Sequence, residues 1–322
     1  MVGAVVVGSR FLIDCLIRVR GIAPTGVIRF GLPATRALPP MTGWPSPLAQ
    51  AMGLHVAMCH GGYDLNGNEL APVDPDEVIA AVDRMVDSGV RSIAISSVFS
   101  PAQPSVEFFA AQVASKRCPD VSVSLSHEVG RLGLIGRENA TILNAGLVEV
   151  AASYFAHLER CLRAEGIDAP IFLSQNDGTV VDIDDATRYP IRTFDSGMTN
   201  AMRGASVLTG LETCVVADMR DHQIGVGVLD QGFPRVRSSR TRLAGVMTNF
   251  RTPDVLVRDL TRGDRSFGER DRSAIERCIA DLVAKLQPNS DSMPVVVVGP
   301  GATLAPTSLA GVSDVVVPVD AQ

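Results

Sequence analysis

Helix-like and strand-like segments alternate along the first half of this chain, and this alternation limits the fold more than any other feature. Residues 76–88 carry apolar side chains at helical spacing and follow an Asp-Pro pair, which is an N-cap and first-turn signal. An apolar strand is expected at residues 90–99, a helix at 105–116 and a second strand at 121–125. This order is typical of βαβ units, so we predict an α/β fold. The connection at residues 31–53 holds five prolines and the only tryptophan, and we expect an ordered surface loop there.

The second half continues the alternation. A long helix is expected at residues 147–165, because Gly166 is a good C-cap residue and Pro170 then leads into a strand. Further segments share strong apolar patterning: strands at 171–175, 215–219, 225–229, 294–299 and 314–319, and a helix at 270–286.

Composition excludes several classes of protein. With 322 residues, 46% of them apolar and 20% charged, the chain has the profile of an ordinary globular protein of one large or two smaller domains. The net charge of −6 and the scattered basic residues argue against nucleic acid as a partner. The first residues lack a basic leader and no apolar run approaches the length of about 20 residues that a membrane span needs, so we predict a cytoplasmic protein without membrane partners. Six widely separated cysteines indicate buried thiols rather than disulfides or a zinc site.

Three glycine-bearing segments follow strands, where open α/β sheets place their ligands. In SQNDGT, Asn176 and Asp177 stand at the end of a strand and Gly178 permits a tight turn, so this is a ligand site or an ordinary turn. In DSGMTNAMRGA, Gly197 could direct amides at an anion, and Ser196 could equally be a plain helix cap.

The third segment, VVVVGPGATLA, contains Gly299 and Gly301 after a strand, which suits a flat or phosphorylated ligand but also many strand-to-helix turns. Other constellations are thinner. His127 and Glu128 are adjacent at the end of a strand, whereas three potential metal ligands have no diagnostic spacing: His60, Asp64 and His222. A Ser-His-Asp triad stays open, although no GxSxG motif supports it.

In the stretch VVADMRDHQIGVGVL, two hydrophobic strands flank a polar turn. The turn carries Arg220, Asp221 and His222, where such turns usually carry glycine.

Several segments, in this order, resemble landmarks of the hydantoinase A and 5-oxoprolinase family: LSHEVG, ENATILNAGL, SQNDGT followed by RYPIRT, SGMTNAMRGA, GFPR and TNFRTPDV. The similarity runs from about Gly8 to Pro306. It implies ATP-dependent opening of cyclic amides of the hydantoin or 5-oxoproline type, with ATP and Mg²⁺ as cofactors. It also implies an α/β, actin- and hexokinase-like (ribonuclease-H-like) ATPase fold, N-terminally shortened, with an incomplete N-terminal-type domain at 1–128 and a shortened hydantoinase A/oxoprolinase-type domain at 129–322.

The chain departs from the family pattern at its phosphate loops. Family members carry Asp-x-Gly-Gly-Thr-x-x-Asp at the VVADMRDHQIG turn, where glycine amides face ATP phosphates and the acidic residues help to hold Mg²⁺. Here Asp218 remains as the metal candidate, Arg220 and Asp221 replace the glycines, His222 replaces the threonine, and Gly225 replaces the second aspartate. Arginine and aspartate do not supply the conformational freedom and the space that glycine gives to a phosphate.

Other loops are altered as well. The family's SGPA has become residues 196–199, and its GAGGGS has become residues 261–266. By the same resemblance, we expect Gly8-Ser9-Arg10 to stand where Gly-Thr-Thr would be, without the upstream first phosphate turn. A carboxylate about 4 Å from a phosphate costs about 1 kcal/mol in water and about 4 at an effective dielectric near 20, so Asp221 and Asp264 should repel ATP.

The resemblance and these positions together give the expected site. The catalytic candidates are Asn176, Asp177, His127 and Glu128, with Asn144 nearby. The candidates for cofactor binding are Asp218, Ser196, Gly197, Gly178, Gly299 and Gly301. We expect a subunit with weakened or lost ATP catalysis, in a homo-oligomer or with a hydantoinase-type partner. The alternatives are an active cyclic-amide hydrolase subunit, or a protein that binds a different anion through Arg220, Arg262 and Arg265.

Overall fold

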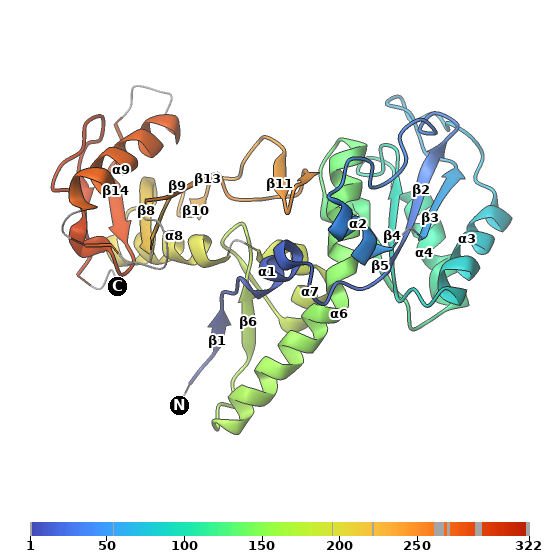
Figure 1. The fold of residues 1–322 in the computed structure, drawn as a ribbon, viewed down its shortest axis with the longest axis horizontal. Coiled ribbons are helices and arrows are strands. Elements are labelled where there is room, and N and C mark those ends of the chain that lie inside the picture. The colour runs from blue at the N-terminus through green and yellow to red at the C-terminus, as the bar shows by residue number, and fades with distance from the viewer. Residues whose placement is uncertain are drawn as a thin grey trace. The chain divides into compact units, whose positions relative to one another are not determined.

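The computed structural model describes residues 2–53, 55–194, 196–220, 222–260, 267–268, 271–286 and 292–319. The chain forms two compact units and passes between them several times (Figure 1). Unit 1 comprises residues 1–173, 181–194 and 239–251, and unit 2 comprises residues 174–180, 195–238 and 252–322. These units do not coincide with the family-type boundary expected at 128/129, because residues 129–173 pack with the first unit. That boundary stays a prediction about family domains.

Unit 1 is built on a four-stranded parallel sheet, in the order β3-β2-β4-β5. Its strands are β2 (Thr25–Leu32), β3 (His55–His60), β4 (Ser92–Ser97) and β5 (Ser122–Leu125). Helices α3 (Pro75–Asp87) and α4 (Ser105–Arg117) cover one face, and α6 (Leu134–Ala164) covers the other (Figure 1). The βαβ layering that the sequence predicted is therefore confirmed.

Both faces of this sheet are buried, and neighbouring residues of a strand serve different cores. Val27 and Ala94 pack in the core on the α6 side, whereas Ile28 and Ile95 pack with α3 and α4. Because side chains alternate across a strand, strands covered on both faces need apolar residues at nearly every position. This explains the continuous apolar runs in the sequence.

Helix α6 begins at Leu134, well before the start expected at residue 147. Every residue from 136 to 147 is buried, including Asn139, Asn144, Gly136 and Gly146. A helix buried all round has no polar face, so it shows no amphipathic period from which its start could be predicted.

The expectation of an ordered surface loop at residues 31–53 is confirmed only in part, because residues 33–45 form turns that are mostly exposed but the end of the segment is a helix. The segment makes tight turns and then forms α2 (Ser46–Met52), and Trp44, Leu48 and Met52 are buried in the core of unit 1. The Trp44 indole Nε1 donates to Asn139 Oδ1 at 3.0 Å, which ties the segment to α6. The prolines favoured the interpretation as a loop, but the apolar residues between them decide the packing.

The remaining elements of unit 1 lie around α6. They are β1 (Val5–Val7), α1 (Phe11–Arg18), α5 (Ser126–Val129), α7 (Ile183–Arg188), the 3-10 helix η1 (Pro190–Thr193), β11 (Thr241–Leu243) and β12 (Val246–Thr248). Strand β1 pairs in parallel with β6 (Ile171–Ser174). Together with β7 (Val180–Val181) they form a three-stranded sheet in the order β1-β6-β7.

Unit 2 contains a six-stranded mixed sheet with the order β10-β9-β8-β14-β15, and β13 pairs with β9. Its strands are β8 (Cys214–Arg220), β9 (Gln223–Asp230), β10 (Phe233–Pro234), β13 (Val255–Asp259), β14 (Val295–Val298) and β15 (Val315–Val316). Its helices are α8 (Ser196–Thr209) and α9 (Arg272–Leu286), and the core between sheet and helices is rich in valine and isoleucine. Strands β8 and β9 form an antiparallel hairpin, as the sequence predicted.

All six cysteines are free thiols, in agreement with the expectation that no disulfide forms. Cys15, Cys59, Cys214 and Cys278 are buried, but Cys161 is exposed on α6. In the part of the chain that the structure describes, no helix is long and apolar enough to cross a bilayer.

Candidate functional site

The expected site residues divide between the two units. His127, Glu128 and the nearby Asn144 belong to unit 1, as do the metal candidates His60 and Asp64. The candidates Asn176, Asp177 and Asp218 and the candidate glycines belong to unit 2. We describe the two groups separately.

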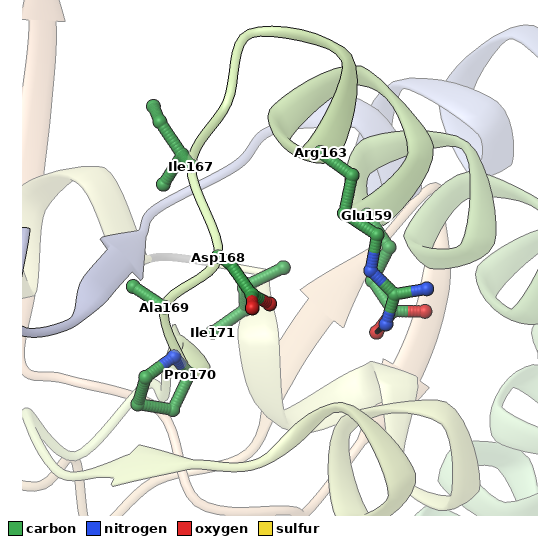
Figure 2. A pocket seen from close by; sticks show the side chains of 7 residues that line it. All are labelled: Glu159, Arg163, Ile167, Asp168, Ala169, Pro170 and Ile171. Carbon is green, nitrogen blue, oxygen red and sulfur yellow. Dashed lines mark hydrogen bonds and ion pairs between the residues drawn. The ribbon is translucent and has the colours of Figure 1, made fainter.

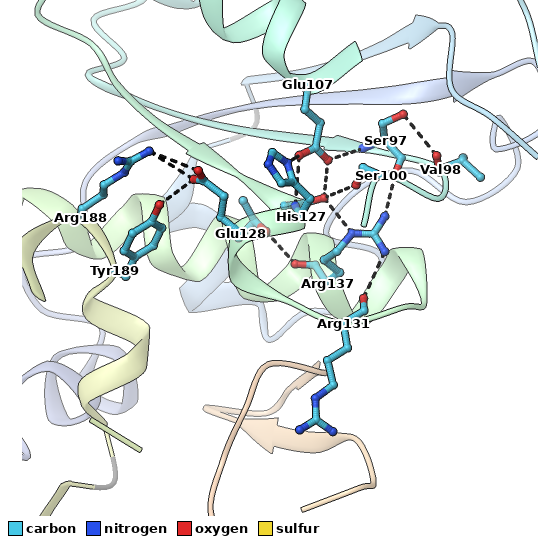
Figure 3. Close-up of polar contacts among 12 residues, drawn as sticks. Ser97, Val98, Ser100, Glu107, His127, Glu128, Arg131, Arg137, Arg188 and Tyr189 are labelled. Carbon is cyan, nitrogen blue, oxygen red and sulfur yellow. Dashed lines mark hydrogen bonds and ion pairs between the residues drawn. The ribbon is translucent and has the colours of Figure 1, made fainter. Parts of the chain in front are cut away.

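His127 lies in α5, directly after β5, and its main partner is Glu107 of α4 (Figure 3). The Glu107 side chain is fully buried. Its Oε2 accepts hydrogen bonds from His127 Nδ1 at 2.7 Å and from the His127 backbone N–H at 3.1 Å. Its Oε1 accepts from the Ser97 backbone N–H at 3.0 Å and from the Ser126 hydroxyl at 2.5 Å.

The hydrogen-bond donors around this carboxylate set its protonation state. Burial raises the pKa of Glu107, but hydrogen bonds from His127, Ser100 and Ser126 outweigh it, and the pKa lies below its ordinary value. Glu107 is therefore ionised near neutral pH. Sequence reasoning missed this residue, because a glutamate in the first turn of a helix normally faces solvent and interacts only with the helix dipole.

Buried Arg137 of α6 joins the same network (Figure 3). Its Nε donates to Ser126 Oγ at 2.8 Å and its Nη2 donates to the Ser97 carbonyl at 2.6 Å. Burial lowers the pKa of Arg137, and the charges of Glu107 and Glu138 oppose this. Since Ser97 ends β4 and Ser126 follows β5, the network lies at the carboxyl ends of two parallel strands, where α/β sheets place ligands.

Glu128 has different partners from its neighbour His127. The Tyr189 hydroxyl donates to Glu128 Oε2 at 2.7 Å, and the Arg188 guanidinium lies 3.4 Å from the carboxylate (Figure 3). Burial and the bond to Glu128 raise the pKa of Tyr189 to about 12. The structure thus separates two residues that the sequence placed together.

Asn144, expected near a ligand surface, is fully enclosed. Its Nδ2 donates to Ser124 Oγ at 3.0 Å and to the Arg188 carbonyl at 2.9 Å, and its Oδ1 accepts from the Ile191 N–H at 3.3 Å. These bonds use its donors and one acceptor position, so Asn144 fixes α6 to the segment that follows α7.

In unit 2, the SQNDGT segment forms a tight turn after β6. Asp177 Oδ1 accepts from the Thr179 N–H at 3.0 Å and from the Thr179 hydroxyl at 2.6 Å. Gly178 has φ of 83°, and a Cβ on it would lie 2.8 Å from Pro234 Cδ. Local geometry therefore accounts for Asp177 and Gly178 as turn residues, while Asn176 is buried.

The β8–β9 hairpin carries Arg220, which the sequence analysis singled out. Arg220 Nε donates to Asp218 Oδ2 at 2.5 Å, and its Nη2 donates to the Gly197 carbonyl at 2.9 Å. Asp218 is only 6% exposed. Burial raises its pKa and the Arg220 charge opposes this. Its second oxygen, Oδ1, is buried and has no hydrogen-bond partner among the residues that the structure describes.

Helix α8 begins at Ser196, so Ser196 and Gly197 lie in its first turn. His222 Nε2 lies 3.8 Å from Asp259 Oδ1. Four further residues from the sequence argument lie outside the described residues: Asp221, Arg262, Asp264 and Arg265.

The glycines after β14 approach the chain itself. Gly299 has φ of 91°, and a Cβ there would lie 2.7 Å from both the Met219 carbonyl oxygen and Asp218 Oδ1. The Gly301 N–H donates to the same carbonyl at 3.0 Å. Packing against β8 is a sufficient reason for glycine at Gly299, whether or not a ligand also approaches.

The Asp218 carboxylate, the metal candidate of the sequence analysis, is paired on one side with a cation. One of its oxygens already binds the Arg220 guanidinium, and across the described ranges no three His, Cys, Asp or Glu side chains gather at one point. Of the other metal candidates, His60 pairs with Glu77, and Asp64 accepts from Asn66 and Asn68 within its own turn.

A hollow of about 330 Å³ lies elsewhere in unit 1, between the last turns of α6 and the start of β6 (Figure 2). Its walls are formed by Glu159, Arg163, Ile167, Asp168, Ala169, Pro170 and Ile171. None of the expected site residues lines it.

Comparison with solved structures identifies the class of fold. The chain resembles the ATP-dependent caprolactamase from Pseudomonas jessenii with a TM-score of 0.70 and 16% identity, over 98% of this chain and 60% of that one. It resembles a nucleotide-free acetone carboxylase with a TM-score of 0.59 and 15% identity, over 80% of this chain and 39% of that one. The fold is thus the mixed α/β fold of these enzymes.

Family models place the chain more closely. Residues 2–118 match the hydantoinase/oxoprolinase N-terminal region and residues 137–255 match the hydantoinase/oxoprolinase model, which together cover most of the sequence. The chain belongs to the hydantoinase/oxoprolinase family.

Two curated relatives match part of the chain. The caprolactamase subunit alpha of Pseudomonas jessenii is 26% identical over 158 residues, which is 48% of this chain and 23% of the relative. An uncharacterized protein of Methanocaldococcus jannaschii is 24% identical over 135 residues, 42% of this chain and 20% of that protein. The matched regions therefore span less than a quarter of either relative.

Proposed function

We propose that this chain is a family subunit derived from an ATP-dependent hydrolase of cyclic amides, of the hydantoin or 5-oxoproline type, in which ATP catalysis is weakened or lost. In this proposal it keeps an actin- and hexokinase-like, ribonuclease-H-like fold. One observation carries the proposal: the Arg220 guanidinium binds both Asp218 Oδ2 and the Gly197 carbonyl.

This arrangement opposes Mg²⁺ and phosphate in different ways. Mg²⁺ needs oxygen ligands in near-octahedral geometry, but one oxygen of the carboxylate already holds a cation that cannot lose its charge. The Arg220 side chain also reaches from the end of β8 to the first turn of α8, where glycine amides would otherwise be open to an anion. In this proposal, the Arg220 side chain both prevents Mg²⁺ from binding Asp218 and occupies space that the phosphates of ATP would need.

Calorimetry and thermal unfolding of the purified chain with ATP and Mg²⁺ test the proposal. We expect no magnesium-dependent ATP hydrolysis and no change in melting temperature. A ligand that binds the folded state stabilises it by about 2.7 kcal/mol at 100 times its Kd, so real binding would be visible. A melting temperature that rises with both ATP and Mg²⁺ would refute the proposal.

Matched variants identify the cause. Arg220→Gly should gain Mg²⁺ affinity that the double variant Arg220→Gly/Asp218→Asn lacks, because the second change removes the freed carboxylate. If the wild type binds Mg²⁺ and ATP as tightly as Arg220→Gly, the guanidinium does not block the site.

The assembly part of the proposal rests on the relative that is named as a subunit. We expect purification from the native host to recover this chain with a hydantoinase-type partner or with further copies of itself. Recovery as a lone monomer at physiological concentration would contradict this part without affecting the first.

An active hydrolase subunit is the second candidate, and the free Asp218 Oδ1 favours it, because this buried acceptor could still receive a ligand. The calorimetry with ATP and Mg²⁺ described above decides between the active subunit and the subunit with weakened or lost catalysis. Binding of a different anion through Arg220, Arg262 and Arg265 is less favoured, because Arg220 already donates from Nε and Nη2 to its own chain. We expect that alanine at all three positions leaves the affinity for phosphorylated metabolites unchanged. A loss of affinity in this triple variant would show that such an anion site exists.

A further inference from the structure

In the Glu107–His127 pair of unit 1, only one of the two imidazole nitrogen atoms is hydrogen-bonded to a described residue of the chain, and the other is available to a ligand. The imidazole is held through Nδ1 by the carboxylate, and its edge meets the Phe108 ring with centroids 4.8 Å apart. Its side chain is 15% exposed, whereas Glu107 is fully enclosed. Within the described part of the chain, Nε2 has no recorded hydrogen-bond partner.

The donors around Glu107 determine where the histidine proton lies. Ser97 and Ser126 donate to one carboxylate oxygen, and the backbone N–H of His127 donates to the other. A carboxylate with a lowered pKa is an acceptor only, so the 2.7 Å contact requires a proton on Nδ1. Neutral His127 must then carry its lone pair on Nε2.

We propose that Glu107 is a positioning residue that holds His127 as the Nδ1–H tautomer and presents a basic Nε2 at the carboxyl ends of β4 and β5. There Nε2 accepts a hydrogen bond from a polar ligand, such as a water, a hydroxyl or an amide N–H. The proposal concerns unit 1 only and does not depend on the fate of ATP in unit 2.

The neighbouring serine does not make this pair into a nucleophilic triad. Ser126 is fully buried, its hydroxyl donates to Glu107 Oε1, and its oxygen accepts from Arg137 Nε. The open nitrogen of His127 therefore serves a group that comes from outside the chain, rather than Ser126.

The chain contains a matched control. Glu77, also in the first turn of its helix, accepts from the His60 backbone N–H at 2.9 Å and lies 3.3 Å from His60 Nδ1, so the connectivity is the same. His60 is 50% exposed and the Glu77 side chain is 27% exposed, in contrast to the buried Glu107. Water competes for this second pair, so it should not fix a tautomer.

Nuclear magnetic resonance of the full chain with ¹⁵N-labelled histidine tests the proposal at about pH 8.5, well above the ordinary imidazole pKa of about 6.5. His127→Gln assigns the His127 signal. We expect the Nδ1–H form in the wild type and a partial shift to the Nε2–H form in Glu107→Gln, because either end of the neutral amide can face Nδ1. Glu77→Gln should leave the His127 signal unchanged and shift the His60 tautomer population little.

Two results would overturn the inference: an Nε2–H tautomer of His127 in the wild type, or an unchanged tautomer in a folded Glu107→Gln protein. If that variant does not fold, the wild-type spectrum still decides. Carbethoxylation of His127, measured by peptide mass spectrometry, is a second readout. It should be slower in folded Glu107→Gln than in the wild type and unchanged in Glu77→Gln, a difference that a purely structural role of Glu107 would not produce.

Discussion

The buried ion pair between Arg29 of β2 and Glu138 of α6 allows a sharp test of why this chain retains the ENATILNAGL segment. Both side chains are 1% exposed. Arg29 Nε donates to Glu138 Oε2 at 2.5 Å, its Nη2 donates to Oε1, and Ser96 Oγ donates at 2.8 Å. In Arg29→Met the carboxylate would keep only the Ser96 hydroxyl.

Arg117 and Asp83 form a surface pair with the same two-pronged geometry. Arg117 Nε and Nη2 donate to the two Asp83 oxygens at 2.8 and 2.6 Å, but the side chains are 50% and 38% exposed. Removing one partner of a buried pair costs about 3–5 kcal/mol because a charge is left without solvent, whereas an exposed pair contributes about 0–1 kcal/mol. Arg29→Met and Arg117→Met thus make the same chemical change at different burial.

Fluorescence of Trp44, the only tryptophan, reports the unfolding of unit 1 in urea. With a slope of about 2 kcal/mol/M, Arg29→Met should lower the midpoint by about 2 M and Arg117→Met by less than about 0.5 M. Arg29→Met/Glu138→Met should recover most of the loss, because no charge stays buried. Equal shifts for the two single variants would refute the argument that desolvation gives Glu138 its structural role.

Two further outcomes follow from the geometry. Tyr189 has its pKa raised from 10.0 to about 12 by burial and by Glu128, so the folded state holds its proton more tightly. Its contribution to stability is complete below about pH 10 and declines as pH rises through about 12. The stability advantage of wild type over Tyr189→Phe should fall by up to about 3 kcal/mol across that range, and a pH-independent difference in urea stability would contradict this. Gly299→Ala should destabilise unit 2 by about 1–3 kcal/mol more than Gly311→Ala, because both positions have positive φ but only the first would contact the Met219 carbonyl. Hydrogen exchange of β14 measures the difference, and equal protection in the two variants would exclude the clash.

Periodicity predicted the parallel sheet of unit 1 and the hairpin of unit 2, because strands covered by helices and short turns have strong local signals. The same approach failed where polar groups are satisfied by distant partners. Asn139 and Trp44 lie far apart in the sequence, and their hydrogen bond brings a proline-rich segment and an apparently polar helix start into the core. No local pattern contains that information.

The candidate site also contains some residues with a local sequence signal and others whose role depends on distant parts of the chain. The sequence identified His127 from its position after a strand. It did not identify Glu107, because the burial of Glu107 depends on how α4 packs against β5. The Arg220–Asp218 bond had a usable signal: residues two apart on a strand point to the same face, so opposite charges at these positions can meet. The sequence predicted that arginine stands where the family carries glycine, and the structure shows that this arginine, Arg220, binds Asp218.

Retained family segments are therefore weak evidence for retained catalysis in this chain. Glu138 and Asn144 have their hydrogen bonds supplied by the protein, and Asp177 is bound within its own turn. Selection for folding alone would preserve such residues, because losing one leaves a buried polar group without a partner. Evidence for ligand chemistry must come from groups with unused capacity. Nε2 of His127 and Oδ1 of Asp218 meet that condition, and experiments that address these two atoms can separate a working site from a retained fold.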